Sequence, residues 1–119
     1  MHLLSFKDQF RFEDRLEEAK RVLLKYPDRV PIICERSLIA SHDCPIIDKK
    51  KYLVPRTYTM GEFLFVIRNR LKLSREKAIF LFVNETFPAT SSLIGDIYHR
   101  HKDKDGYLYI SYSQENTFG

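Results

Sequence analysis

One short stretch, Asp48–Pro55 (DKKKYLVP), constrains the possible folds of this chain more than any other. In an extended strand, successive side chains alternate between two faces, so Lys51 and Leu53 share one face and Tyr52 and Val54 the other. Lysines and a closing proline are typical of a strand at the edge of a sheet. We therefore expect an edge strand with apolar groups on both faces, which can accept a peptide as an added strand. A solvated edge without a partner is the alternative.

Size and composition fit one domain with a buried core. The chain has 119 residues, of which 44% are hydrophobic and 30% charged. It lacks an apolar run of the roughly 20 residues that cross a bilayer, and the N-terminus lacks the apolar centre of a secretory signal. We expect a cytoplasmic protein. Cys34 and Cys44 are too few for a disulfide framework, and Cys34 is expected to be reduced and buried.

Positive charge is concentrated in the middle of the chain. Residues 49–77 contain nine Lys or Arg and two Glu, a charge of +7, so the remainder contributes −3 to the total of +4. Such a segment favours an acidic partner, which leaves acidic peptides, anionic lipid and nucleic acid. Nucleic acid is the least favoured, because the sequence has no aromatic and basic platform of known type.

Hydrophobic periodicity and capping patterns predict the other elements. The predicted helices are a short one opened by Ser5 and Asp8, one from Phe12 to Leu23 that ends before Pro27, a main helix from the capping box Thr59–Glu62 to Leu71, and one over Ile94–His101. The predicted strands are Val30–Glu35, Asp48–Pro55, Ile79–Val83 and Tyr107–Tyr112. Because Ile79–Val83 is apolar at every position, we expect this strand in the middle of the sheet.

This order of elements predicts an α+β fold. It suits a β-grasp layout, a four-stranded mixed sheet with the main helix across one face. The main helix occupies that face, so we place the N-terminal helical extension on the other. Within a single domain overall, we expect the extension at 1–27, the β-grasp core at 28–113 and a flexible C-terminal tail at 114–119. The loop 37–47 is assigned no role.

The sequence carries no recognisable catalytic or metal-binding constellation. It has no glycine-rich phosphate loop, no zinc-spaced Cys/His set and no nucleophile with a recognisable base. His99 and His101 are two residues apart on a predicted helix and therefore diverge. A site made of Cys34, His42 and Cys44 would need a fourth ligand. We expect a protein that is not an enzyme and that holds no cofactor or metal.

Six long blocks that cover nearly the whole chain carry a family resemblance. They are KYPDRVPIICER (25–36), DKKKYLVP (48–55), FLFVIRNRL (63–71), IFLFVNE (79–85), PATSSLIGDIY (88–98) and YLYISYS (107–113). In these blocks the chain resembles the ubiquitin-like modifiers of autophagy, the group of the GABA-receptor-associated protein and the microtubule-associated light chain.

The resemblance implies a covalent attachment at Gly119, which follows Thr117 and Phe118 as the tail of the family does. Activating and conjugating enzymes would carry its carboxylate as a thioester to the amine of phosphatidylethanolamine on the autophagosome membrane, and a deconjugating cysteine protease would release it. A terminus without a side chain suits a narrow enzyme channel. The end at Gly119 is an encoded, a processed or an artificial terminus.

The resemblance also implies two pockets beside the edge strand. They would bind short motifs of an aromatic residue, two spacers and an aliphatic residue, as carried by cargo receptors and autophagy factors. The aromatic pocket would use Glu18, Val22, Pro31, Ile33, Lys51, Leu53 and Tyr107. The aliphatic pocket would use Tyr52, Val54, Pro55, Tyr58, Phe63, Val66 and Ile67. Acidic residues around the motif would meet Arg29, Lys49, Lys51 and Arg70. Tyr58 and Met60 stand where smaller aliphatic residues are commoner in this family.

The alternative is a non-conjugated adaptor of the same fold. It would bind peptides through the groove, or the acidic tubulin tails of microtubules through the basic middle of the chain. Detection of a lipid-linked form discriminates between the two hypotheses.

Overall fold

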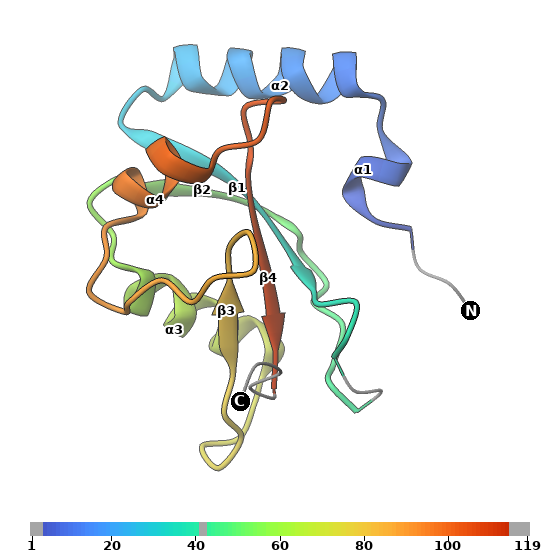
Figure 1. Ribbon diagram of the computed structural model, residues 1–119, viewed down its shortest axis with the longest axis vertical. Coiled ribbons are helices and arrows are strands. Elements are labelled where there is room, and N and C mark those ends of the chain that lie inside the picture. Colours follow the sequence, from blue (N-terminus) through green and yellow to red (C-terminus); the bar gives the residue numbers. More distant parts are fainter. Residues whose placement is uncertain (1–3, 41–42, 115–119) are drawn as a thin grey trace.

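Two helices precede the first strand and two more lie between later strands, as Figure 1 shows for this computed structural model. The structure describes residues 4–40 and 43–114. In chain order the elements are α1 (Phe6–Gln9), α2 (Phe12–Lys25), β1 (Arg29–Arg36), β2 (Lys51–Pro55), α3 (Met60–Leu71), β3 (Phe80–Phe82), α4 (Ile94–His101) and β4 (Leu108–Ser113). Among the described residues, no helix combines the length and the apolar character that crossing a membrane requires.

The strands form one mixed four-stranded sheet in the order β2-β1-β4-β3. The central strands β1 and β4 are parallel, with Cys34 opposite Ile110. Strand β2 is antiparallel to β1, with Ile32 opposite Tyr52, and β3 is antiparallel to β4. The predicted mixed sheet is confirmed, and so is the position of β2 at its edge.

The predicted place of Ile79–Val83 in the middle of the sheet is wrong, because β3 forms the other edge. Its apolar composition has a different cause. The ring of Phe87 lies 5.9 Å from that of Phe80 and 4.6 Å from that of Phe82, while Leu81 belongs to the core on the opposite face. Both faces of β3 are therefore packed although only one side of it is hydrogen-bonded to a strand.

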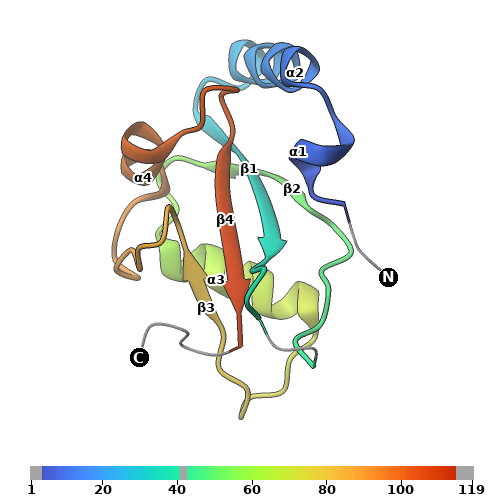
Figure 2. The ribbon, with the colours of Figure 1, turned by 45° about the vertical axis from the view of Figure 1, so that its right-hand side comes forward.

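The two faces of the sheet carry two separate apolar clusters. On one face, Ile32 of β1 packs in the main core together with residues of α3 and α4. On the other face, Ile33 packs with Phe6 of α1 and Ala19 of α2. Figure 2 shows the N-terminal helices and α3 on different sides of the strands. The predicted placement of the N-terminal helices opposite the main helix is confirmed.

Helix starts follow the predicted capping boxes. The Ser5 side chain accepts a hydrogen bond from the Asp8 backbone N–H, whose carboxylate accepts one from Ser5 in return. Thr59 and Glu62 make the same reciprocal pair at the start of α3. Each box satisfies N–H groups that a helix cannot pair internally.

A buried ion pair, which the sequence did not reveal, fixes α2 to the sheet. The Arg15 Nη1 atom lies 2.6 Å from Oδ2 of Asp105, whose side chain is fully buried. The Tyr109 hydroxyl donates to the same oxygen at 2.5 Å, and the Tyr107 backbone N–H donates to Oδ1 at 2.8 Å. The next residue, Gly106, has a φ of 94°, and a Cβ there would lie 2.9 Å from Cβ of Ala19. This turn therefore requires glycine, and it brings α2 close to β4.

Candidate peptide-binding groove

The free edge of β2 separates two differently lined surfaces. Tyr52 and Val54 are buried on the side of α3, whereas Lys51 is exposed and Leu53 half-buried on the side of α2. The predicted alternation of the strand is confirmed. The edge thus offers backbone groups to a further strand, with a distinct side-chain environment on each face.

On the α2 side, the structure gathers the residues predicted for an aromatic pocket. Pro31 and Ile33 of β1 are buried and stand opposite Leu53 and Lys51 in the register of the sheet. Tyr107 is 3% exposed and packs in the same cluster as Ile33. Glu18 and Val22 lie four residues apart on α2, so they share the helix face above them. The floor of this region is apolar and its rim is charged.

The rim is closed by a charged contact between α2 and β2. The Lys51 ammonium lies 2.8 Å from Oε1 of Glu18, and the Tyr107 hydroxyl donates a hydrogen bond to the same oxygen. Burial raises the pKa of Glu18, but the hydrogen bonds and charges of its partners outweigh burial and leave this pKa below its ordinary value of 4.5. Burial and the Glu18 carboxylate raise the pKa of Tyr107, so its hydroxyl remains a donor.

Two phenylalanines of the N-terminal segment also line this rim, and sequence reasoning missed both. The Lys51 Nζ atom lies 5.4 Å from the ring centre of Phe6 and 5.8 Å from that of Phe10. Phe6 is 3% exposed and meets the ring of Tyr107 edge-on at 5.4 Å. The capping box at Ser5 predicted the short helix, but one helical turn shows no periodicity that could assign its face.

On the other side of β2, the residues predicted for an aliphatic pocket meet α3. The rings of Tyr52 and Phe63 are 5.6 Å apart and perpendicular, and Val54 and Ile67 are buried beside them. These four residues form part of the core. Pro55 ends β2 and is half-buried. The predicted set is thus brought to the boundary between β2 and α3, although most of it is not open to solvent.

The open part of this region is a hollow of about 410 Å³. Its lining residues are Tyr58, Thr59, Gly61, Glu62, Phe65 and Val66. Of the predicted set, Tyr58 and Val66 therefore line the hollow. Phe65, which is 65% exposed, was missed because it lies outside the apolar stripe that defined the buried face of the helix. Met60 is buried in the core and is not among the residues that line the hollow.

The four predicted basic residues all have partners within the chain. Arg70 makes two hydrogen bonds to Asp48, at 2.8 Å and 3.3 Å, and these bonds lower the pKa of Asp48. Lys51 pairs with Glu18, and the Lys49 ammonium lies 5.2 Å from the centre of the Tyr52 ring. The structure does not bring the four together at one point.

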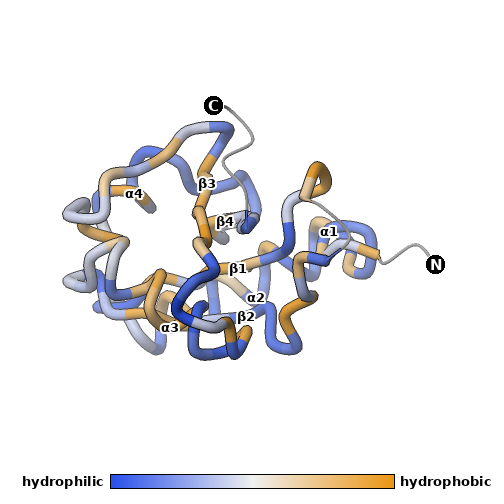
Figure 3. The backbone as a smooth tube through the Cα atoms, turned by 90° about the horizontal axis from the view of Figure 1, so that it is seen from below, coloured by the Kyte–Doolittle hydropathy of each residue, from blue (hydrophilic) through white to orange (hydrophobic). Residues whose placement is uncertain are grey.

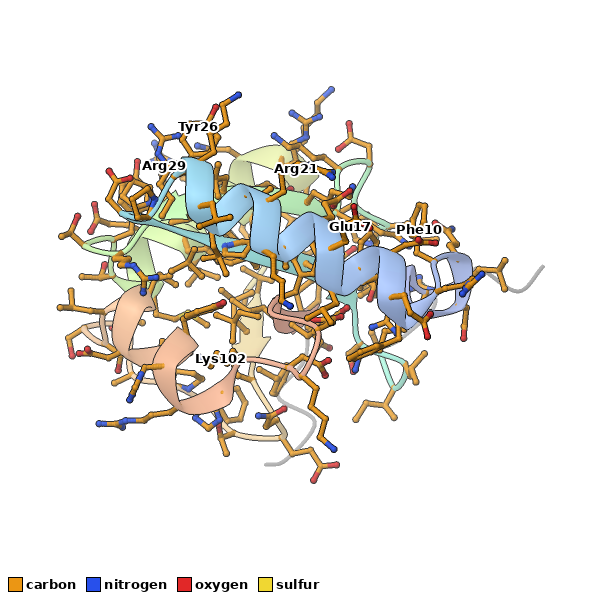
Figure 4. All side chains as sticks on the ribbon, turned by 90° about the horizontal axis from the view of Figure 1, so that it is seen from above. Phe10, Glu17, Arg21, Tyr26, Arg29 and Lys102 are labelled. Atoms are coloured by element: carbon orange, nitrogen blue, oxygen red, sulfur yellow. The ribbon has the colours of Figure 1, made fainter. Side chains whose placement is uncertain are left out.

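Arg29 lies away from the other three, at the start of β1 next to the end of α2. Its guanidinium stands 5.5 Å from the ring centre of Tyr26, and Figure 4 shows these two side chains together beyond the C-terminal turn of α2. Lys50, which was not predicted, pairs with Glu35 at 3.1 Å, and Glu35 also accepts the Phe6 backbone N–H at 2.8 Å. Lys50 therefore helps to hold α1 on the sheet.

The described residues offer no cluster of three or more His, Cys, Asp or Glu that could hold a metal ion. Cys34 is buried, and burial raises the pKa of its thiol, which disfavours the nucleophilic thiolate. His42 and Gly119, named in the sequence-based hypotheses, lie outside the residues that the structure describes.

Comparison with known proteins identifies the family. The family model described as "Autophagy protein Atg8 ubiquitin like" matches residues 14–119. The chain belongs to the Atg8 family of ubiquitin-like autophagy proteins. Autophagy-related protein 8 of Mycosarcoma maydis is 57% identical over 115 residues, which are 97% of this chain and 96% of that protein. Autophagy-related protein 8 of Kluyveromyces lactis is 56% identical over 97% of this chain and 91% of its own length.

A solved Atg8 structure has the same fold. The crystal structure of Trypanosoma brucei ATG8 superposes with a TM-score of 0.86 at 39% sequence identity, and the match covers 94% of this chain and 95% of that one. The predicted family and the predicted ubiquitin-like α+β fold are both confirmed.

Proposed function

We propose that the protein is joined through the Gly119 carboxylate to phosphatidylethanolamine on autophagic membranes, and that it recruits motif-bearing cargo receptors and autophagy factors to them. The observation that carries the proposal is the Atg8 family match, which extends to Gly119 itself. Activating and conjugating enzymes form the bond, and a cysteine protease reverses it. In this role the protein is a modifier on which enzymes act.

The groove along β2 is the recruiting surface. A peptide added to this edge gains backbone hydrogen bonds and places alternate side chains on the two faces of the sheet. Its aromatic residue reaches the region over Ile33 and Leu53, and its aliphatic residue reaches the region between Val54 and Val66. Two buried anchors contribute about 1.5–3 kcal/mol each and a few hydrogen bonds about 1 kcal/mol each, before ordering costs. Single motifs then bind at roughly micromolar strength, and many copies on one membrane add avidity.

Charge on the rim selects motifs with acidic neighbours. Lys51 and Arg70 are paired with Glu18 and Asp48, and both pairs are partly exposed, with 45–49% of each basic side chain accessible. Partly exposed ion pairs contribute little to stability, so exchanging the internal carboxylate for one from the peptide costs little. A neutral motif has no carboxylate to offer and leaves the internal pairs in place.

Reconstitution tests the conjugation. Wild-type protein incubated with its activating and conjugating enzymes, ATP and phosphatidylethanolamine liposomes is expected to form a lipid adduct, visible by gel shift and mass spectrometry. Gly119→Ala should form none, while Gln114→Ala, which changes a residue near the same end, should react as the wild type does. An adduct that survives Gly119→Ala contradicts the site. A wild type that forms no adduct but still binds motifs supports the adaptor that is not conjugated.

A paired substitution tests the groove. Lys51→Ala combined with Leu53→Ala should weaken binding of a motif peptide at least tenfold in calorimetric titration, which corresponds to about 1.4 kcal/mol. Lys20→Ala combined with Leu24→Ala removes the same residue types from the exposed part of α2 and serves as the control, with unchanged affinity expected. Circular dichroism should show both variants folded. Equal affinity of the two variants would place the groove elsewhere.

A further inference from the structure

Two apolar side chains are presented to solvent on the turn that follows β1. Leu38 is 98% exposed and Ile39 is 64% exposed. The backbone beneath them is nevertheless held in place: the Ala40 N–H donates to the Ser37 carbonyl at 3.1 Å, and the Ile39 N–H donates to the Ser37 hydroxyl oxygen at 3.3 Å. A fixed turn that displays two large apolar groups exposes surface that folded proteins normally bury.

This turn lies at the end of the sheet from which the C-terminal segment leaves. Strands β1 and β4 are parallel, with Arg36 opposite Tyr112, so both end on the same side. The Ser37 N–H donates to the Tyr112 carbonyl at 2.8 Å, which ties the turn to the end of β4. Gly119 is the fifth residue after Gln114. Fully extended, five residues span at most about 17 Å, so a membrane joined to Gly119 lies close to this end.

The same end carries a net positive connection. Strand β3 is antiparallel to β4, with Phe80 opposite Ser113, so the connection from α3 into β3 lies there too. It exposes three basic side chains, Lys72, Arg75 and Lys77, and one acidic side chain, Glu76. Figures 1 and 2 show this connection, the turn after β1 and the end of β4 at the lower end of the molecule, with α2 at the upper end. Figure 3, which looks at the lower end, shows a hydrophobic turn beside the short grey trace at 41–42.

We propose that Leu38 and Ile39 insert into the bilayer to which Gly119 is joined, while Lys72, Arg75 and Lys77 contact its anionic headgroups. The proposal rests on the conjugation argued above. A bilayer is the occupant that suits this end. The short tail keeps a membrane within reach, and an exposed apolar tip with basic side chains at the same end of the molecule is a pattern of membrane-surface binding.

Insertion at this end sets the orientation of the groove. Strand β2 runs antiparallel to β1, and Pro55 pairs with Arg29 at the end of the sheet away from the turn. Membrane contact through Leu38 and Ile39 therefore leaves the free edge of β2 facing sideways, with α2 farthest from the lipid. Receptors then reach the groove without competing with the bilayer.

Tryptophan fluorescence tests the insertion, because the chain contains no Trp. Leu38→Trp introduces a single reporter at the turn. Leu24→Trp is the matched control, since Leu24 is 85% exposed but lies on α2 at the opposite end. Each full-length variant carries six histidines after Gly119 and is tethered to liposomes that contain a nickel-chelating lipid, anionic lipid and lipids with brominated acyl chains.

On these liposomes the Leu38→Trp emission should shift to the blue and fall at least twofold relative to liposomes without bromine, whereas Leu24→Trp should keep its intensity. Equal behaviour of the two reporters overturns the proposal. A blue shift of Leu38→Trp without quenching by bromine also overturns it, because the turn would then contact another protein copy. The histidine tether bypasses the conjugating enzymes. Quenching in the tethered protein with no adduct in the reconstitution would keep the insertion and reject the conjugation.

Discussion

Lys51 of β2 and Glu18 of α2 form an ion pair of 2.8 Å across the rim of the aromatic side of the groove. The pair joins the N-terminal helices to the edge strand, and its cation is also the one best placed to meet an acidic peptide. In the proposed function, a peptide carboxylate and Glu18 compete for the same ammonium group. The proposal thus couples peptide recognition to the attachment of α2 through this contact.

Removing the charge of Glu18 should strengthen the binding of acidic motifs. Glu18→Gln leaves Lys51 without an internal carboxylate, while the amide oxygen can still accept the Tyr107 hydroxyl. We expect two- to fivefold tighter binding of a motif preceded by acidic residues, about 0.4–1 kcal/mol, and little change for a neutral motif. Calorimetric titration of both peptides measures the difference. Equal changes for the two peptides would show that Glu18 does not compete.

The ion pair of Lys51 and Glu18 should make part of the free energy of unfolding depend on pH. Glu18 has a lower pKa in the folded protein than its ordinary 4.5. Its contribution is therefore complete above that ordinary value and is lost as the pH falls through the lower, folded-state value. The difference in the free energy of unfolding between wild type and Glu18→Gln should be constant above about pH 5 and shrink below it, with a size of at most about 1 kcal/mol.

Urea unfolding at a series of pH values measures this difference. Glu17→Gln, on the exposed face of the same helix, is the control and should show no such loss. A difference that grows as the pH falls would contradict the assigned direction of the Glu18 pKa.

The buried pair of Arg15 and Asp105 should dominate the attachment of α2. Asp105→Ala removes the carboxylate that pairs with the Arg15 guanidinium. Because only 10% of the Arg15 side chain is exposed, water cannot easily replace that carboxylate. Breaking a buried pair from one side costs about 3–5 kcal/mol. Chemical denaturation should show a loss in that range. Arg11→Ala, which breaks an ion pair between side chains that are 78% and 70% exposed, should cost less than about 1 kcal/mol. Similar losses for both variants would contradict the structural role of Asp105.

Tyr58 should control which aliphatic residue the groove prefers. Its side chain lines the hollow beside α3, so Tyr58→Leu enlarges the space available to the motif. The affinity for a motif ending in leucine, divided by that for a motif ending in valine, should rise about threefold. This change approaches the free energy gained by burying one methylene group. Met60→Leu, a substitution in the core, should leave this ratio unchanged. A ratio that moves with Met60 and not with Tyr58 would exclude Tyr58 from the pocket.

Local patterns were sufficient to predict most elements of the fold. The capping boxes at Ser5 and Thr59 gave the starts of two helices, and the alternation from Lys51 to Val54 gave the faces of β2. The position of β3 could not be read in this way, because burial by the Phe87 side chain and burial by a second neighbouring strand leave the same apolar pattern.

The candidate site was predicted through family resemblance, and its unpredicted parts depend on contacts distant in sequence. Arg15 and Asp105 are 90 residues apart, and neither lies in a pattern that indicates burial. Phe6 contributes to the aromatic side from a single helical turn, which is too short for a periodic signal. Phe65, which lines the open part of the aliphatic side, was missed for a different reason: it is exposed and lies outside the apolar stripe of α3.

The measurement that tests the central claim most directly is an NMR titration of isotope-labelled protein with an aromatic-x-x-aliphatic peptide. The account predicts that the largest amide shift changes fall on Lys51–Pro55, with intermolecular backbone contacts that align the peptide as a strand beside β2. Smaller changes should extend to Glu18 and Val66. Shift changes centred elsewhere, for example on the hollow between Thr86 and His101 beside α4, with β2 unaffected, would contradict it.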